Sequence, residues 1–179
     1  MSLVTLIRHA PLPLKNQKCY NGHIDLDIDT TLVDSEQIKA LKKQKYDLVY
    51  SSDLKRCTQT LDLLNLSYKK DERLREVKFK DEFEGKSFDE ISKMSIYDEK
   101  YLSSFESWHK FISQESIEEY KQRVNSFLNE LPKDKDKDIL ICSHGGTIKL
   151  IDALIKKVSY EQSTFSINYL ESSSYNFNL

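Results

Sequence analysis

Glycine, proline and cysteine are scarce in this chain of 179 residues, with 4, 3 and 3 copies respectively. So few glycines and prolines exclude a collagen-like protein and a flexible linker. The cysteines, Cys19, Cys57 and Cys142, are odd in number and form no CxxC pair, which excludes a disulfide framework and a zinc ribbon. Such cysteine usage fits a reducing compartment, so we expect a cytoplasmic protein.

An excess of one charge and a long apolar run are also absent. Lys and Arg number 27 against 29 Asp and Glu, a formal net charge of −2, whereas nucleic-acid binders usually show a basic excess. The apolar run Leu3–Ile7 is too short for a signal peptide or a spanning helix, which needs roughly 20 residues. We therefore expect neither a nucleic acid nor a membrane as a partner.

The length predicts one domain over residues 1–179, because domains usually hold roughly 100–200 residues. No Gly/Ser/Pro-rich linker or internal repeat divides the chain. The alternating charges of Lys133–Asp138 indicate a solvated loop. Residues 78–112 are rich in charged and aromatic residues without a clear period. We expect short helices there, in an excursion that contributes nothing to the core.

Three short apolar segments predict buried strands: Leu3–Ile7, Asp47–Tyr50 and Ile139–Cys142. None alternates clearly between apolar and polar residues, as is typical of parallel strands covered on both faces. Near the C-terminus, Phe165–Leu170 and Tyr175–Leu179 predict two further strands around a polar turn.

Apolar residues at helical spacing predict the helices between these strands. Ser52 and Ser116 stand where residues that cap a helix N-terminus are expected. The predicted helices are Ser35–Lys43, Asp53–Leu64, Ser116–Leu131 and Thr147–Lys156. Strands that alternate with helices predict an α/β fold, a three-layer α/β/α sandwich around a mostly parallel sheet.

Polar residues of one chemistry follow each of the first three predicted strands. Arg8 and His9 follow the first, Arg56 lies in the helical turn after the second, and His144 follows the third. The carboxyl ends of parallel strands form the edge where ligands bind in open α/β sheets. Two predicted helices also begin there, and helix N-termini attract anions. Together these groups predict a phosphate site.

Each residue alone has an ordinary structural explanation. A single histidine is usually a surface or core residue, the SHGG segment could be only a turn, and Arg56 could be a charge on a helix surface. The shared location of all these groups favours the functional interpretation.

Several segments, in chain order up to residue 151, match the signatures of one family. They are TLIRHA (5–10), YNGHIDLDI (20–28), SSDLKRCTQTL (51–61), LREV (74–77) with FEGKSFDEI (83–91), ESIEEYKQRVNSFLNEL (115–131) and ICSHGGTIKLI (141–151). They resemble the histidine phosphatase superfamily, which contains the phosphoglycerate mutases. The resemblance implies a phosphoglycerate mutase-like fold and a metal-independent phosphatase that needs no cofactor and acts on a small phosphorylated substrate.

The resemblance also implies roles for particular residues. His9 would attack phosphorus and form a phosphohistidine, with its other ring nitrogen donating a hydrogen bond, for example to backbone. Arg8, Arg56 and His144 would bind the phosphate oxygens and stabilise the transition state by their positive charge.

Three further residues of the matched segments receive roles in the same way. Glu76, in LREV, would protonate the leaving oxygen and then activate water, which would require a raised pKa. Gly145 and the backbone N–H groups behind it would add to the phosphate cradle. Asn21 would line the pocket.

The chain departs from the family pattern at a few positions. Ala10 replaces the glycine of the LIRHG signature, Pro11-Leu12 replaces the usual Glu-Thr, and Lys80 replaces a glycine and is followed by one extra residue. The departures at Ala10 and Pro11-Leu12 affect the turn after His9. The departure at Lys80 affects how the loop after Glu76 places that side chain in the pocket.

The short connection between His9 and Cys19 resembles that of α-ribazole phosphatases, so the best-supported substrate is α-ribazole 5′-phosphate of cobalamin synthesis. A phosphatase of another small ester, such as a sugar phosphate or a nucleotide, is the alternative. A catalytically inactive phosphate-binding module is an alternative of another class. The histidines lack the HxH and HExxH spacings, so we expect no metal centre.

Overall fold

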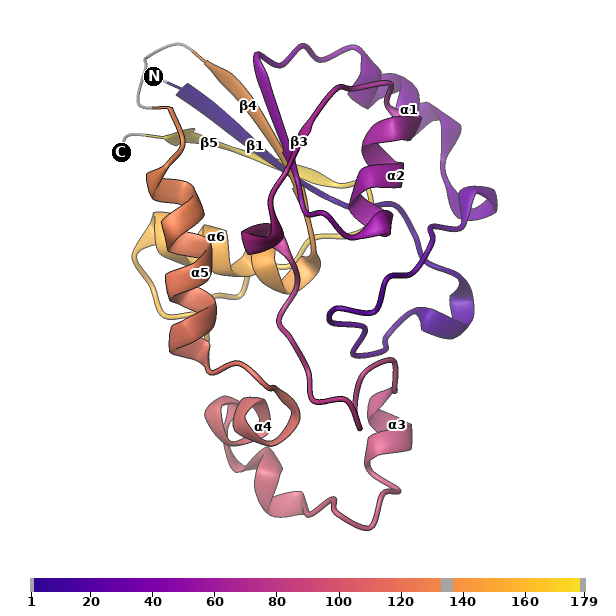
Figure 1. The fold of residues 1–179 in the computed structure, drawn as a ribbon, viewed down its shortest axis with the longest axis vertical. Coiled ribbons are helices and arrows are strands. Elements are labelled where there is room, and N and C mark those ends of the chain that lie inside the picture. Colours follow the sequence, from indigo (N-terminus) through magenta and orange to yellow (C-terminus); the bar gives the residue numbers. More distant parts are fainter. Residues whose placement is uncertain (1, 133–136, 178–179) are drawn as a thin grey trace.

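The computed structural model describes residues 2–132 and 137–177 of the chain (Figure 1). Most of the Lys133–Asp138 tract, and the last residues of the strand predicted at 175–179, lie outside the described residues. Within them, no helix combines the length and apolarity that crossing a membrane would require.

A sheet of five strands forms the middle layer, in the order β3-β2-β4-β1-β5. Strands β3, β2, β4 and β1 run parallel to one another, and β5 runs antiparallel to β1. The strands are β1 Ser2–Arg8, β2 Leu48–Ser51, β3 Lys69–Lys70, β4 Asp138–Ser143 and β5 Ser172–Phe177. The three strands predicted from apolar runs are confirmed, and β1 and β4 pair along their whole length from Leu3 with Asp138 to Arg8 with Ser143.

Helices cover both faces of this sheet, which confirms the three-layer α/β/α arrangement (Figure 1). Ile7, Val49 and Leu140 face α1 and α2 in one buried cluster, whereas Val4 and Ile141 face α5 and α6 in the other. Since neighbouring strand residues face opposite sides and both sides are buried, the strands show no polar alternation. The helices are α1 Ser35–Lys42, α2 Lys55–Leu63, α3 Phe88–Ile91, α4 Phe105–Ile112, α5 Ile117–Asn129 and α6 Gly145–Lys156.

Two helix starts differ in how well the sequence indicated them. Ser116 caps α5 in a capping box with Glu119, as predicted. The cap position of α2 is Leu54 rather than Ser52. The Ser52 hydroxyl accepts from the Leu54 N–H at 3.4 Å and lies 2.9 Å from His144 Nε2. Helix α6 begins at Gly145, two residues earlier than expected.

The predicted strand at Phe165–Leu170 is wrong. This segment is an irregular loop in which Leu170 adopts a positive φ of 59°, a conformation that ends an extended strand. Ile167 and Leu170 are buried, so the apolar residues that suggested a strand instead anchor the loop to the core. The last strand, β5, pairs with β1 rather than with this segment.

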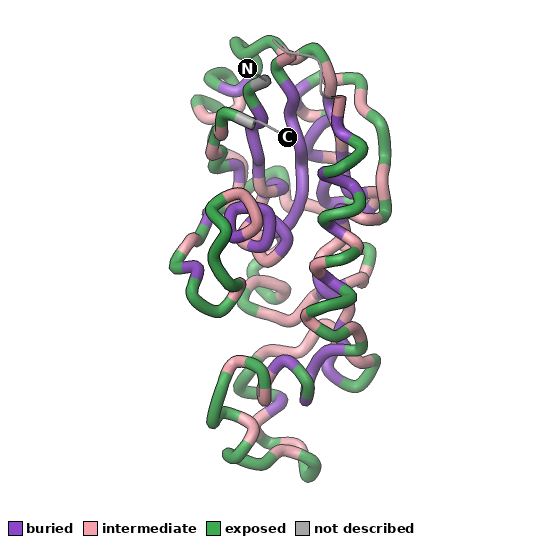
Figure 2. The backbone as a smooth tube through the Cα atoms, turned by 90° about the vertical axis from the view of Figure 1, so that its left-hand side faces the viewer, coloured by how far each residue is buried: buried purple, intermediate pink, exposed green. Residues whose placement is uncertain are grey.

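Residues 78–112 contain the short helices expected, α3, α4 and a 3-10 helix at Glu99–Ser103, and they lie beyond one end of the sheet (Figure 1). The expectation that the region contributes nothing to the core is wrong. Phe79, Phe83 and Ile91 are buried, and they belong to the same apolar cluster as the sheet and α5. Figure 2 shows this lobe with buried stretches among exposed ones. Aromatic residues such as Phe79 and Phe83 lie in loops and show no helical spacing in the sequence, yet their side chains pack into the core.

One buried side chain ties α2 to the turn that follows β1. The Thr60 hydroxyl accepts a hydrogen bond from the Ala10 N–H at 2.7 Å and donates one to the Arg56 carbonyl at 2.6 Å. Thr60 is fully buried, so neither partner has water as a substitute.

Thr60→Val should lower the free energy of unfolding by about 1–3 kcal/mol, because valine keeps the shape but leaves the Ala10 N–H without an acceptor. Urea unfolding monitored by circular dichroism measures this. Thr164→Val, at an exposed position, is the matched control and should stay within about 0.5 kcal/mol. Equal stability of the two variants would contradict the assignment.

Candidate active site

A pocket of about 230 Å³ lies at the carboxyl ends of β1, β2 and β4. Every residue that the sequence predicted for the site lines it: Arg8, His9, Asn21, Arg56, Glu76, His144 and Gly145. Parallel strands bring these residues together because their carboxyl ends share one edge of the sheet.

His9 follows β1 and is only 4% exposed. Its Nδ1 lies 2.8 Å from the Ala10 carbonyl, and a carbonyl can only accept, so Nδ1 carries the hydrogen. This confirms the expected hydrogen bond to backbone and leaves Nε2 with a free lone pair. Burial, together with the nearby Arg56 charge, holds the pKa of His9 well below its usual value of 6.5. The ring is therefore a neutral base at neutral pH.

Arg56, in the first turn of α2, is 1% exposed and uses all three guanidinium nitrogens. Its Nε donates to His144 Nδ1 at 3.0 Å, and its terminal nitrogens donate to the carbonyls of Ile24 at 2.7 Å and Gly22 at 2.6 Å. Each terminal nitrogen keeps a second N–H. The loop after β1 therefore fixes the guanidinium while leaving donors for an anion.

His144 precedes α6 and is also buried. Because Nδ1 accepts from Arg56, Nε2 carries the hydrogen, and it donates to the Ser52 hydroxyl at 2.9 Å. Burial and the Arg56 charge hold the pKa of His144 well below 6.5. The expectation that His144 supplies positive charge is therefore wrong: it is a neutral donor, and Arg8 and Arg56 supply the charge.

Two buried atoms of pocket residues have no hydrogen-bond partner among the described residues: Arg8 Nε and Asn21 Oδ1. The guanidinium of Arg8 is held by two contacts. Its Nη1 donates to the Ile167 carbonyl at 2.8 Å, and its Cζ lies 4.1 Å from the centre of the Tyr169 ring. Asn21 donates through Nδ2 to the Asn16 carbonyl at 2.7 Å. A buried polar group without a partner is costly, so this donor and this acceptor are the pocket atoms with the most to gain from a hydrogen bond to a bound molecule.

Glu76 reaches the pocket from the loop before α3. Its Oε1 accepts from the Val77 N–H and the Tyr120 hydroxyl, both at 3.0 Å, and its Oε2 accepts from the Gly146 N–H at 2.9 Å. A Cβ at Gly146 would lie 2.5 Å from Oε1, so only glycine leaves the carboxyl in this position.

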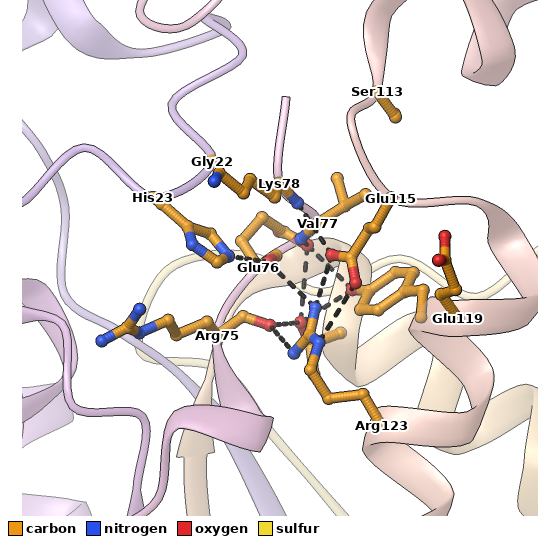
Figure 3. Close-up of polar contacts among 12 residues, drawn as sticks. Gly22, His23, Arg75, Glu76, Val77, Lys78, Ser113, Glu115, Glu119 and Arg123 are labelled. Atoms are coloured by element: carbon orange, nitrogen blue, oxygen red, sulfur yellow. Dashed lines mark hydrogen bonds and ion pairs between the residues drawn. The ribbon is translucent and has the colours of Figure 1, made fainter. Parts of the chain in front are cut away.

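The main chain around Glu76 is held from α5. Arg123 donates to the Arg73 carbonyl at 2.9 Å. It also donates to the carbonyls of Arg75 at 3.0 Å and Glu76 at 3.3 Å, and forms an ion pair with Glu115 (Figure 3). His23 Nε2 also lies 3.0 Å from the Glu76 carbonyl (Figure 3). His23 therefore supports the segment from the turn at Gly22.

The sequence did not indicate the rest of the pocket wall, which consists of Leu12, Lys18, Cys19, Tyr20, Gly22, Val77, Phe79, Gly146, Tyr160 and Tyr169. Tyr169 lies in the loop at residues 165–170, where the sequence predicted a strand. Trp108 is not among the lining residues but packs against Tyr20 and Phe88. Among the described residues, no group of three or more His, Cys, Asp or Glu side chains could hold a metal ion.

This arrangement combines a neutral imidazole, two arginines, the N-terminus of α6 and one carboxyl group. Arginines and helix N-termini bind phosphate oxygens, and an imidazole with a free Nε2 is a nucleophile. The pocket is thus suited to phosphoryl transfer.

Comparisons with known proteins agree with this chemistry. The sequence profile of the histidine phosphatase superfamily (branch 1) matches residues 4–178. A Hydrogenobacter thermophilus protein named "Putative phosphoserine phosphatase 2" is 31% identical over 169 residues, which span 90% of this chain and 82% of that protein.

Solved structures share the fold at lower identity. The α-ribazole phosphatase from Shigella flexneri is 23% identical with a TM-score of 0.81, covering 98% of this chain and 91% of that one. A phosphoserine phosphatase from Entamoeba histolytica, in complex with 3-phosphoglyceric acid, is 23% identical with a TM-score of 0.79, covering 99% and 91%.

The two pocket histidines should show opposite neutral tautomers, His9 with hydrogen on Nδ1 and His144 with hydrogen on Nε2. Neither ring should gain a proton as the pH falls through 6.5, because burial lowers both pKa values. Nitrogen-15 NMR of the rings measures both properties, with His9→Gln and His144→Gln used for assignment. A ring that titrates near 6.5, or two identical tautomers, would contradict the hydrogen-bond assignment.

Proposed function

The chain belongs to the histidine phosphatase superfamily, and on this premise we propose that it is a single-domain, cytoplasmic phosphomonoesterase that works through a phosphohistidine on His9. The observation that carries the proposal is the free Nε2 of a buried, neutral His9 beside Arg8 and Arg56. Buried unpaired Cys57 and Cys142 support the cytoplasmic location, where thiols stay reduced.

In the first step, His9 Nε2 attacks phosphorus and the bond to the ester oxygen breaks. The free donors of Arg8 and Arg56 bind the non-bridging oxygens, with the N–H of Gly145 beside them. His144, whose Nε2–H is donated to Ser52, holds the Arg56 guanidinium through Nδ1. These charges and dipoles are fixed before substrate arrives, so they stabilise the transition state without reorganising.

Glu76 handles the proton in both steps. It protonates the leaving oxygen, and its carboxylate then takes a proton from the water that hydrolyses the phosphohistidine. His9 is thereby regenerated and inorganic phosphate is released. The arginines supply the positive charge, so we propose that neither a metal ion nor another cofactor takes part.

For the substrate we propose α-ribazole 5′-phosphate. Leu12, Tyr20, Val77 and Phe79 give the pocket an apolar and aromatic wall, which suits the neutral aromatic base. The unpartnered Asn21 Oδ1 suits a ribose hydroxyl. The Shigella flexneri neighbour, an α-ribazole phosphatase, has the same fold.

Phosphoserine is the second candidate, because the 31% identical relative bears that name. Its ammonium group would favour a negatively charged partner, and Glu76 is the sole acidic residue among the described residues that line the pocket. Since the mechanism already uses Glu76, the lining favours an uncharged leaving group. Sugar phosphates and nucleotides are further candidate substrates of the same mechanism.

The substrate test is phosphate release from α-ribazole 5′-phosphate, O-phosphoserine, a sugar phosphate and a nucleotide, all with chelator present. We expect the ribazole ester to have the highest kcat/KM. His9→Ala should lose about a thousandfold or more on every substrate, because the nucleophile is gone. An acid-labile phosphoenzyme should form in the wild type and not in the variant.

Each other result has a distinct meaning. A higher kcat/KM for phosphoserine would contradict the substrate and keep the mechanism. Turnover without loss in His9→Ala would contradict the mechanism. Phosphate binding without any turnover would support an inactive binding module instead.

A pair of glycine variants tests the role of Glu76. Gly146→Ala would place a Cβ 2.5 Å from Glu76 Oε1 and displace the carboxyl, so we expect kcat/KM to fall about 10- to 100-fold. Gly145→Ala places its Cβ 3.4 Å from Arg8 Cζ, an ordinary contact, and should cost less. Both positions lie in the first turn of α6, so helix propensity changes equally and the activity ratio reports on Glu76. Equal losses would contradict this.

A further inference from the structure

Tyr120 is a buried tyrosine whose hydroxyl lies between two polar groups of the site. The side chain comes from α5 and is 2% exposed. Its hydroxyl lies 3.0 Å from Glu76 Oε1 and 2.7 Å from the Thr147 hydroxyl. With the Tyr120 hydrogen donated to Glu76, the single hydrogen of the Thr147 hydroxyl is shared between the Tyr120 oxygen, at 2.7 Å, and the Arg75 carbonyl, at 2.9 Å. Residues from α5 and α6 thus meet at one oxygen of Glu76.

The two oxygens of Glu76 have different surroundings. Oε1 has contacts with the Val77 N–H, the Tyr120 hydroxyl and, at 3.4 Å, the Thr147 hydroxyl. Among the described residues, Oε2 has a single hydrogen bond, from the Gly146 N–H. Oε2 is therefore the oxygen with capacity left for a substrate, and the contacts at Oε1 set its direction.

The main chain of Glu76 does not depend on Tyr120. Arg123 lies one turn further along α5 and holds the carbonyls of Arg75 and Glu76 (Figure 3). Its guanidinium also lies 4.9 Å from the centre of the Tyr120 ring. Residues three apart on a helix share a face. Arg123 therefore contacts the main chain of the Glu76 segment, and Tyr120, on the same face of α5, contacts the Glu76 carboxyl group. Loss of the Tyr120 hydroxyl alone leaves the segment in place.

We propose that Tyr120 is a positioning residue that holds Glu76 Oε1 and so directs Oε2 at the leaving oxygen of the substrate. This assignment rests on the proposed function. As His9 Nε2 bonds to phosphorus, the phosphorus–oxygen bond breaks and its electron pair stays on the ester oxygen. That oxygen takes the proton of Glu76, and Glu76 becomes a carboxylate.

The Tyr120 hydroxyl remains a hydrogen-bond donor at any pH at which the enzyme works. Burial and the nearby Glu76 raise the pKa of Tyr120 well above its usual value of 10. Tyr120→Phe removes this hydroxyl and keeps the ring that packs in the core.

The test compares two substrates that differ in their need for an acid. An alkyl phosphate has a poor leaving group, whereas 4-nitrophenyl phosphate leaves without protonation. For Tyr120→Phe we expect kcat/KM to fall about tenfold or more on the alkyl ester and less than about twofold on the aryl ester, since general acid catalysis is worth roughly 10²–10⁴-fold. The parameter kcat/KM covers only steps through phosphoenzyme formation, so the common hydrolysis step does not mask the difference.

Three further variants sharpen the result. Tyr175→Phe removes another tyrosine–carboxylate hydrogen bond, 2.6 Å to Asp152, at a residue outside the pocket lining, and should leave both rates unchanged. Thr147→Val removes the hydroxyl that orients Tyr120 and lies 3.4 Å from Glu76 Oε1. It should show a selective loss of the same kind, smaller because the Tyr120 bond to Glu76 remains, and it serves if Tyr120→Phe does not fold. In a Glu76→Gln background, Tyr120→Phe should cause no further loss, because Tyr120 acts through Glu76.

Two outcomes would overturn the assignment while leaving the proposed function intact. One is an equal loss on both esters, which indicates a purely structural role. The other is no loss on either ester. A wild type that hydrolyses neither ester and forms no phosphoenzyme would overturn the proposed function and the role of Tyr120 with it.

Discussion

The buried guanidinium of Arg56 is the group on which the rest of the pocket depends. It bonds to a ring nitrogen of His144 and to the carbonyls of Gly22 and Ile24, so it joins α2, α6 and the loop after β1. By donating to Nδ1 it selects the tautomer of His144. Its charge also helps keep His9 neutral. One arginine thus selects the tautomer of His144, adds to the burial that keeps His9 neutral, and holds the loop opposite them.

The sequence predicted the parts of the fold and site that depend on local pattern. Apolar runs identified β1, β2 and β4, and the residues after them converged as the topology of parallel strands requires. The charge of His144 was not predictable from pattern, because it depends on burial and on a bond from Arg56, which is distant in the chain. The burial of Phe79 and Phe83 was not predictable for a related reason. These residues lie in loops, and loops have no periodic pattern that distinguishes buried from exposed positions.

The segment after Phe165 shows the limit of strand propensity. Its sequence favours a strand, yet the positive φ of Leu170 turns the chain. In this loop the Ile167 carbonyl accepts a hydrogen bond from Arg8, and the Tyr169 ring stacks on the Arg8 guanidinium. Tertiary contacts with one arginine outweighed local preference. The even more polar Ser172–Phe177 became the strand, because an unpaired edge of β1 was available beside it.

The parallel pairing of β1 with β4 has a consequence for folding. Leu3 pairs with Asp138, so the two strands join segments that are far apart in the sequence. The His9 N–H can donate to the Ser143 carbonyl only once these strands have paired. Such non-local pairing is slow because a long loop must close first. A chain in which β1 and β4 have not yet paired therefore lacks the pocket at their carboxyl ends. A ligand of this pocket should bind only the complete fold and so protect the whole chain, rather than one lobe, from unfolding and proteolysis.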